Sequence, residues 1–444
     1  MRSERREEGG GWRWGYLALL LLSVVISVAA VLLFDRASAR DSLLDLTNLV
    51  GPTTASLLEG RGLTACTERM GTPGNPICFH GGRMPIPTLV VAGGMRLLGD
   101  RFVRVALLKT LLLLVPLELA MYLVWVRVRS ARPAMRWVSA LLLMVPFGMT
   151  AFLADVVNLQ VEEGYTYSFL ALLTAVVLFR GPREGWLRRD GGGEAVVFGV
   201  AAAGLYLAKS AMAPAAAVLT LAYLVRLRGW RVRVMAAVLA LAAPVGWAAY
   251  QHHATGRYSL GTSIDGLNLH KGNDAEFLLA YPPSRGHTLD GLDTELNAGR
   301  HFDDEWSFND YHQRAAVEFM EGHPGATARG EVRKLAMIFV SVEKSGSSAS
   351  QGALRLAEVG GMVVFRVIFW AALAVSVLGV GRGWGGLRWE GGVFLLLVGA
   401  VALPYVIGFA YTRHVSVLIY PAVLLCCRAL VTRGPEAVGT EGLH

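Results

Sequence analysis

The stretch WGYLALLLLSVVISVAAVLLF, residues 14–34, holds 21 residues and no charged side chain. A helix of roughly 20 apolar residues crosses the hydrocarbon core of a bilayer, which is ~30 Å thick. The stretch could instead be a secretory signal peptide, but many further apolar runs follow it. The sequence therefore predicts an uncleaved first membrane span.

Further apolar runs follow along the 444-residue chain, in which 54% of the residues are hydrophobic and 17% are charged. This composition is too apolar for a soluble protein of this length. We therefore predict an all-α polytopic membrane protein with about ten transmembrane helices. The predicted spans are residues 15–34, 103–126, 137–154, 165–179, 195–208, 212–225, 234–250, 360–380, 392–410 and 415–429.

Basic residues gather in the short segments between the predicted spans. The net charge is +8, and four arginines without any acid lie in residues 127–136 and again in residues 226–233. Residues 180–190 add four arginines against two acids. Short basic loops mark the cytoplasmic side of a membrane protein. The pattern predicts that both termini are cytoplasmic, and it argues against a nucleic-acid partner.

Alternation of the spans from a cytoplasmic N-terminus divides the chain into three parts. Residues 1–250 form an N-terminal membrane module that includes a first external loop, residues 35–101. Residues 251–359 form a second external region, which holds seven of the ten histidines. Residues 360–444 supply the last membrane helices and a short cytoplasmic tail.

Both external regions carry patterns of amphipathic helices. LVGPTTASLLEGRGL, from Leu49, predicts a helix along the membrane interface that ends at Gly60. The periodic stretch around residues 310–339 is interrupted at His323-Pro324. By contrast, alternating apolar residues between Gly256 and Asp274 predict an ordered loop with strand-like character.

The four cysteines form two pairs in the sequence. Cys66 and Cys78 flank a Gly/Pro-rich turn in the first external loop. In an oxidising compartment they would close a short disulfide loop, and the alternative is two free thiols. Cys426 and Cys427 lie inside the last apolar run and are expected to be packing residues.

Acids and cations near the predicted outer surface are the candidates for chemistry. Asp45 lies about one turn into an apolar-patterned stretch, where partial burial could tune a general base, whereas Asp41 and Glu59 look solvated. Arg83 could bind a lipid phosphate or act as a snorkelling anchor. Lys209 lies in AKSAMAP, which predicts a tight external hairpin because Pro214 favours a break there.

Two further groups of polar residues indicate a functional site less clearly. Glu162 and Glu163 stand at the mouth of the fourth predicted span, where acids either face water or point inward at high cost. The stretch HFDDEWSFNDYH, residues 301–312, has metal-capable side chains, but its spacing fits no familiar metal site.

Several motifs, in their order along the chain, resemble the GT-C superfamily of polytopic glycosyltransferases. The resemblance is specifically to its family-39 type, which includes protein O-mannosyltransferases and the lipid A aminoarabinose transferase. Asp45 is followed fifteen residues later by Gly60. Where the family often has a second acid and an aromatic residue, this chain has Leu46 and Leu49. Further blocks of the same kind are RMPIPTLVVAGGMRLLG, LYLAKSAMAP, GRYSLGTSIDGLNLHKGND and RHVSVLIYPAVLL.

The resemblance implies a GT-C-like bundle and a role for each matching residue. Asp45 is expected to be the general base, and Glu162 or Glu163 the second acid of the site. Lys209 is expected to bind the donor phosphate, with Arg83 and Arg413 as further phosphate ligands. The loop that meets donor or acceptor would carry Asn268, Lys271 and Asn273.

The function implied is an inverting glycosyl transfer at the outer face of the cytoplasmic (inner) membrane. The donor would be a polyprenyl-phosphate-linked sugar, and the acceptor a hydroxyl of a lipid, a glycan or a protein, with an envelope glycan or lipid favoured. Membrane lipids would surround the enzyme, and neither a metal nor another cofactor is expected. Two alternatives remain open: a transporter or flippase of lipid-linked sugars, and a non-catalytic membrane scaffold of the same fold.

Overall fold

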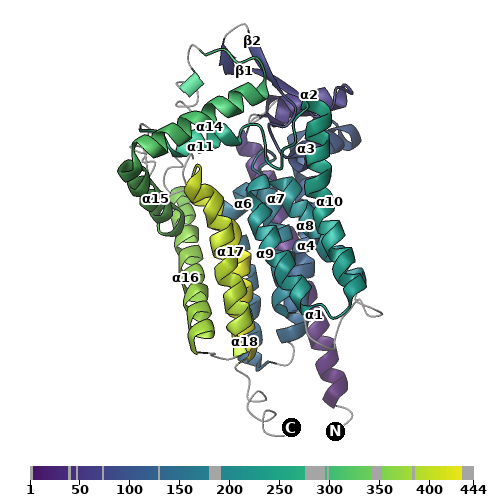
Figure 1. Ribbon diagram of the computed structural model, residues 1–444. Coiled ribbons are helices and arrows are strands. Elements are labelled where there is room, and N and C mark those ends of the chain that lie inside the picture. The colour runs from purple at the N-terminus through teal and green to yellow at the C-terminus, as the bar shows by residue number, and fades with distance from the viewer. Residues whose placement is uncertain are drawn as a thin grey trace.

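A computed structural model of the chain describes residues 4–38, 42–46, 49–72, 75–128, 131–179, 192–275, 296–297, 300–342, 353–382 and 386–432. Asp41 and the predicted basic loop 180–190 lie outside these residues. The described chain is a bundle of long helices that carries a smaller cap at one end (Figure 1). α1 begins and α18 ends at the opposite end of the bundle.

Eleven helices of the described chain build the bundle. Their bounds are α1 (Glu4–Ser38), α4 (Phe102–Val128), α5 (Pro133–Met144), α6 (Thr150–Val157), α7 (Glu163–Phe179), α8 (Gly192–Ala208), α9 (Ala213–Arg226), α10 (Trp230–Thr255), α16 (Ala353–Arg382), α17 (Arg388–Ile407) and α18 (Ile419–Thr432). The closest neighbours are α8 with α10, α4 with α7, and α16 with α17. The fold is therefore an all-α bundle, as the sequence predicts.

Six helices of the described chain are long and apolar enough to cross a membrane. They are Trp14–Phe34, Phe102–Val128, Trp230–Thr255, Arg355–Arg382, Arg388–Ile407 and Thr412–Val431. Four shorter apolar helices accompany them: Pro85–Leu98, Glu163–Phe179, Gly192–Ala208 and Ser210–Arg226. Three of these four coincide with predicted spans. The total of ten spans therefore stays a prediction.

The span predicted at residues 137–154 is not one straight helix. The pair Pro133–Gly148 and Thr150–Val157 is bent by 61°. Pro146 lies in η2 (Val145–Gly148), the 3₁₀ turn at the break. Proline has no N–H to donate and its ring crowds the preceding turn, which accounts for the bend.

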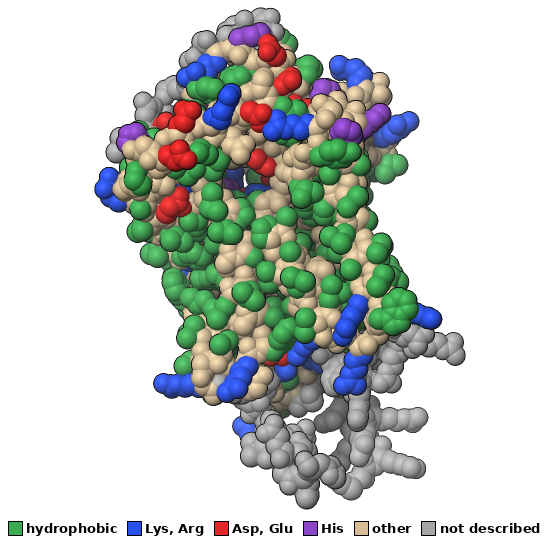
Figure 2. Space-filling model, in the orientation of Figure 1, with side chains coloured by type: hydrophobic (Ala, Val, Ile, Leu, Met, Phe, Trp, Pro, Cys, Tyr) green, Lys and Arg blue, Asp and Glu red, His purple; other side chains and the backbone are tan. Residues whose placement is uncertain are grey.

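The outside of the bundle is apolar over its middle section. Figure 2 shows hydrophobic side chains covering this section, basic side chains at its lower edge and most of the acidic ones toward the cap on the face shown. Leu22, Val115, Leu241 and Val367, on four different helices, are all exposed. A soluble protein rarely exposes so large an apolar surface, so this surface fits the lipid-facing belt of a membrane protein.

The centre of the bundle is α7. Every residue of this helix except Phe169 is buried, and it packs against α4, α8 and α18. A helix that is apolar all round belongs in the middle of a bundle. Its first residue, Glu163, is thereby fixed at the boundary between bundle and cap.

The cap is formed by the two regions that the sequence predicts to be external. It contains η1 (Leu43–Asp45), α2 (Val50–Leu58), β1 (Ala65–Thr72), β2 (Asn75–Phe79), α11 (Asp265–Gly272), α14 (Glu305–Gly322) and α15 (Pro324–Phe339), while α3 (Pro85–Leu98) leads back to the bundle. The predicted amphipathic helices are present as α2, α14 and α15. The strand-like character predicted for residues 256–274 is wrong, because eight of these residues form α11.

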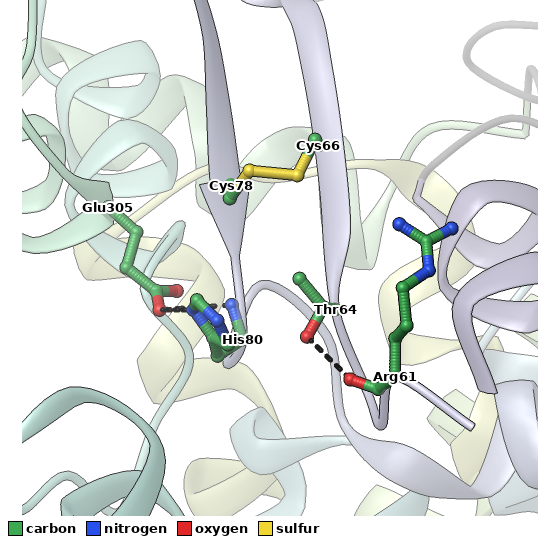
Figure 3. Close-up of a disulfide and its surroundings, with 6 residues drawn as sticks. All are labelled: Arg61, Thr64, Cys66, Cys78, His80 and Glu305. Atoms are coloured by element: carbon green, nitrogen blue, oxygen red, sulfur yellow. Dashed lines mark hydrogen bonds and ion pairs between the residues drawn. A yellow bond between two sulfur atoms is a disulfide. The ribbon is translucent and has the colours of Figure 1, made fainter. Parts of the chain in front are cut away.

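Two kinds of link hold the cap together. The structure joins Cys66 and Cys78 in a disulfide between the antiparallel strands β1 and β2, as the sequence predicts. Closing a loop of this length is worth about 3 kcal/mol in the loop-entropy treatment. Glu305 on α14 then ties the two external regions to each other, since it accepts hydrogen bonds from the backbone N–H groups of His80 (2.9 Å) and Gly81 (3.1 Å). Figure 3 shows the disulfide above this contact.

The same glutamate also binds two side chains. The hydroxyl of Ser263 donates to its carboxylate, and the His80 ring lies 3.2 Å away (Figure 3). This hydrogen bond from the ring raises the pKa of His80. Glu305 therefore fixes the chain just before Arg83 relative to the chain just before α11.

Candidate functional site

Five charged side chains meet where the cap rests on the bundle. They are Arg83, Glu162, Glu163, Lys209 and Arg413, and we call them the ion cluster. The sequence predicted all five as site residues from separate parts of the chain. Figure 2 shows a hollow at this level of the molecule with basic side chains inside it.

Glu163 is the buried centre of the ion cluster. Its carboxylate lies 2.5 Å from Lys209 Nζ and 3.9 Å from Arg413 Nε. The His414 ring nitrogen Nε2 lies 3.5 Å from the same carboxylate. Only 3% of the Glu163 side chain is exposed. A buried carboxylate is tolerated when opposite charges surround it, so Glu163 acts as the fixed counter-ion of the two cations.

Glu162 occupies a different position from its neighbour. Its carboxylate bridges Arg83 Nη1, at 3.1 Å, and Lys209 Nζ, at 3.7 Å, and it is 13% exposed. Arg83 keeps one further donor, because its Nε is buried and has no hydrogen-bond partner among the described residues. An unpaired buried N–H is costly, and an incoming anion would satisfy it.

Local structure fixes the position of Lys209. The residue lies in the turn between α8 and η3 (Ser210–Met212), followed by Pro214 in the first turn of α9. This confirms the predicted hairpin. The Lys209 ammonium also lies 5.3 Å from the centre of the Tyr405 ring, which stacks on His414 at 4.1 Å. Neither Tyr405 nor His414 was predicted as a site residue, because packing alone brings them there.

Arg83 is positioned by the tight contact of the preceding loop with α10. A side chain at position 81 would place its Cβ 1.9 Å from Gln251 Nε2, so the Gln251 side chain would have to move. Ser263 N donates to the Gly81 carbonyl at 3.0 Å, which links this loop to the start of α11. Arg83 follows two residues later, just before Pro85 begins α3.

Asp45 ends η1 and is exposed. It forms no hydrogen bond or ion pair with any described residue, so no direct contact joins it to the ion cluster. The adjacent Leu46 packs in one apolar cluster with Val157 and Leu159, a few residues before Glu162. The Asp45 segment therefore rests on the chain that carries the two glutamates, and the role of Asp45 stays a prediction.

The two departures from the family pattern have a structural reason. Leu46 is 3% exposed and Leu49 is 7% exposed, each within an apolar cluster. Leu49 also has a φ of 64°, a left-handed conformation that is rare for a side chain of this kind. A second acid at position 46 would be buried in the apolar cluster, so these leucines serve packing.

The predicted donor or acceptor loop forms α11 and its end. Gly272 approaches the backbone of Gly408 so closely that a Cβ would lie 1.8 Å from the Gly408 oxygen. The amide of Asn273 donates to the backbone oxygen of Ile407 at 2.7 Å, and Lys334 donates to the oxygens of Gly272 and Gly408. These contacts attach α11 to the end of α17.

The other two predicted residues of this loop differ in their surroundings. Lys271 is buried with its ammonium 5.4 Å from the centre of the Phe409 ring, and Asn268 is half-buried. The predicted roles of Asn268, Lys271 and Asn273 toward a substrate remain predictions, whereas the contacts of Asn273 are structural.

A buried histidine pair in the cap joins α11, which carries His270, to α14, which carries His312. His270 and His312 face each other with their Nδ1 atoms 2.9 Å apart, and His312 Nε2 lies 2.9 Å from Asn297 Oδ1. Burial lowers the pKa of His312 to about 3, and the neighbouring His270, Arg300 and Lys271 act in the same direction. Burial also lowers the pKa of His270, against the opposing charge of Asp274. The folded cap therefore holds this pair neutral.

Acid should loosen the cap through His312. In the unfolded chain the His312 imidazole takes up a proton near pH 6.5, whereas in the folded chain it stays neutral down to about pH 3. Stability present above pH 6.5 is therefore lost as the pH falls, by about 2 kcal/mol between pH 6.5 and 4.5. Melting temperatures across this range should fall less in His312→Gln than in the wild type. The exposed His323→Gln is the control and should keep the wild-type slope; equal slopes in all three proteins would contradict the assignment.

Within the described residues, no three His, Cys, Asp or Glu side chains are grouped so as to hold a metal ion. The ion cluster instead pairs each carboxylate with cations. A donor that it leaves unpaired among the described residues is the buried Nε of Arg83.

The chain was also compared with known proteins. No family model, no curated protein and no solved structure matches it. The residues and their geometry are therefore the basis for a functional proposal.

Proposed function

We propose that this protein is an inverting glycosyltransferase that uses a polyprenyl-phosphate-linked sugar. The observation that carries the proposal is the ion cluster, in which three cations converge at the membrane boundary around two carboxylates. A polyprenyl-phosphate donor puts its lipid tail in the bilayer and its phosphate at this depth. The motif resemblance to GT-C enzymes supports the same reading, and the order of those motifs matches the residues that meet in the cluster.

The cations suit the chemistry of the leaving group. When the bond from the sugar C1 to the phosphate oxygen breaks, the electron pair stays on the polyprenyl phosphate. Lys209 and Arg83 would stabilise this developing charge, because fixed cations in a site shielded from water act strongly on a transition state. Arg413 would add to the field from the far side of Glu163. A monophosphate needs no more charge than this, so we propose that transfer is independent of metal ions.

The acceptor hydroxyl requires a base. In our proposal, Asp45 takes its proton while the acceptor oxygen attacks C1 from the side opposite the phosphate, which inverts the anomeric centre. One base suffices for this single displacement, in contrast to retaining enzymes with a nucleophilic carboxylate. Because Asp45 is free of ion pairs to described residues, its carboxylate is available to an acceptor.

The charge pattern supports an orientation of the protein in the membrane. Basic side chains lie at the end of the bundle opposite the cap (Figure 2), where the positive-inside rule puts the cytoplasm. We propose that the cap faces outward from the cytoplasmic membrane, with both termini inside. The acceptor, an envelope glycan or lipid in our proposal, would reach the hollow from the cap side.

A transporter of lipid-linked sugars is the strongest rival. It predicts charged side chains inside the spans, and Lys109, Glu118 and Asp155 are buried in α4 and α6. The sequence pattern alone did not reveal this number of buried charges. Lys109, however, donates to the backbone oxygens of Asp155 (3.4 Å) and Asn158 (2.6 Å), which is a bracing contact beneath the ion cluster.

One assay separates the three candidate functions. The purified protein in lipid vesicles is supplied with a polyprenyl-phosphate sugar, and the release of free polyprenyl phosphate is followed with an acceptor extract. Release supports a transferase. Movement of the intact lipid-linked sugar between leaflets without release would establish a transporter instead, and binding with neither outcome would establish a scaffold.

Lys209 gives the proposal its first direct test. Lys209→Ala should weaken binding of polyprenyl phosphate by about 10- to 100-fold, since a charge-assisted contact to phosphate contributes about 1.5–3 kcal/mol. Binding is measured by titration calorimetry in detergent. The matched control is Arg61→Ala, which removes an exposed cation that pairs only with Glu59 among the described residues. Unchanged affinity in Lys209→Ala would make this lysine a structural anchor.

A further inference from the structure

A third carboxylate lies near the ion cluster, on the cap side. Asp265 is the first residue of α11. Two residues before it, Ser263 donates its N–H to the oxygen of Gly81 at 3.0 Å, and Gly81 precedes Arg83 by two residues. The charges of Glu162 and Arg83 act on the pKa of Asp265. The surrounding protein raises that pKa, against the hydrogen bonds from Thr262. The side chain is nevertheless exposed, whereas Ile264 and Gly266 on either side are buried. A ligand can therefore reach Asp265 from the solvent.

The Asp265 carboxylate is held rigidly. Oδ2 accepts the Thr262 N–H at 2.8 Å, and Oδ1 accepts the Thr262 hydroxyl at 2.7 Å. A Cβ on Gly261 would lie 2.1 Å from Oδ2, so the loop needs glycine there to seat the carboxylate. Each oxygen uses one lone pair in this way and keeps another for a ligand.

The loop before Asp265 is also fixed to the bundle. The indole of Trp247 donates to the Gly261 oxygen at 2.9 Å, and the hydroxyl of Tyr206 donates to the Leu260 oxygen. Tyr206 lies one turn before Lys209 on the same stretch of chain. Asp265 thus has a set position relative to both phosphate-binding cations.

We propose that Asp265 binds a hydroxyl or amino group of the sugar carried by the donor, so that the enzyme takes a neutral or cationic sugar and rejects a uronic acid. This inference rests on the proposed function, because the group attached directly to a phosphate at Arg83 is the sugar ring. A carboxylate with one free lone pair on each oxygen accepts hydrogen bonds from neighbouring hydroxyls. A uronic acid would bring a second carboxylate beside Asp265 and Glu162, and like charges repel at such a distance.

The test compares soluble donor analogues on the full-length protein. The probes are farnesyl phosphate and its mannosyl, arabinosyl and glucuronosyl phosphodiesters, and the readout is Kd by titration calorimetry in detergent. We expect the better neutral sugar to bind at least about 10-fold more tightly than farnesyl phosphate, and the glucuronosyl probe to bind no more tightly than farnesyl phosphate. Asp265→Asn should remove the discrimination against glucuronate, and Asp265→Ala should also remove most of the gain from the neutral sugar. The Kd of farnesyl phosphate itself should stay the same.

Control variants separate this inference from the function it rests on. Asp303→Asn changes a carboxylate that is 90% exposed and should behave as wild type, and melting temperatures confirm that each variant is folded. A wild-type protein that binds farnesyl phosphate through Lys209 but shows no sugar preference overturns the inference alone. The inference is also overturned if Asp265→Asn weakens the binding of all four probes equally, because Asp265 would then only position Arg83. Failure of the wild type to bind farnesyl phosphate overturns both proposals.

Discussion

Asp45→Asn should lower the turnover of sugar transfer by about 10²- to 10⁴-fold, the range in which a general base contributes. Asparagine keeps the size of the side chain and cannot take up the acceptor proton. Asp45 is exposed and has no ion pair to a described residue, so the fold should tolerate the change. Release of polyprenyl phosphate under saturating donor measures the loss.

A binding measurement and a control variant make this experiment decisive. The Kd for farnesyl phosphate should be unchanged in Asp45→Asn, because the phosphate ligands are elsewhere. The control is Glu59→Gln at the end of α2, since Glu59 is an exposed acid of the same segment that pairs with Arg61. Near-normal turnover in Asp45→Asn would remove Asp45 from the mechanism. A loss that is equal in Glu59→Gln would mean that the net charge of the segment, rather than one base, matters.

The sequence predicted the class of fold because long apolar runs are typical of transmembrane helices. Most of the predicted spans are single helices in the described chain. The exceptions are residues 137–154, which are bent at η2, and residues 415–429, which begin in a 3₁₀ turn before α18. The short helix α11 was missed, because eight residues with Gly266 and Gly272 among them carry no clear helical period. It forms because the contacts of Gly272 and Asn273 with the end of α17 hold it in place.

The sequence also singled out the charged residues that meet in the ion cluster, but it did not predict which of them pair with each other. Residues adjacent in a chain point in different directions, so Glu162 and Glu163 could not be ranked by pattern. Glu163 begins the buried helix α7 and is enclosed, whereas Glu162 stays at the rim. Asp265, for which we propose a role, was not predicted for a related reason: the fold of its loop sets its position, and no spacing along the chain encodes that fold.

Glu163→Gln should be the most destabilising single change in the site. It leaves Lys209 and Arg413 facing a neutral amide in a buried setting, where Lys209 is 11% exposed and Glu163 only 3% exposed. Removing one partner of a buried ion pair costs about 3–5 kcal/mol, because the remaining charge stays desolvated. The measurement is thermal unfolding in detergent, with folded protein followed by size-exclusion chromatography.

Glu162→Gln is the matched comparison, because it is the same change one residue away. Its partners Arg83 and Lys209 are respectively 25% and 11% exposed, and Lys209 keeps Glu163. We expect a loss of about 1 kcal/mol or less, as for partly solvated pairs. The double variant Glu163→Gln/Lys209→Gln should recover part of the loss, since it removes the stranded ammonium along with its partner. If Glu163→Gln and Glu162→Gln lose equal stability, Glu163 is not the fixed counter-ion, and the two carboxylates are interchangeable rim charges.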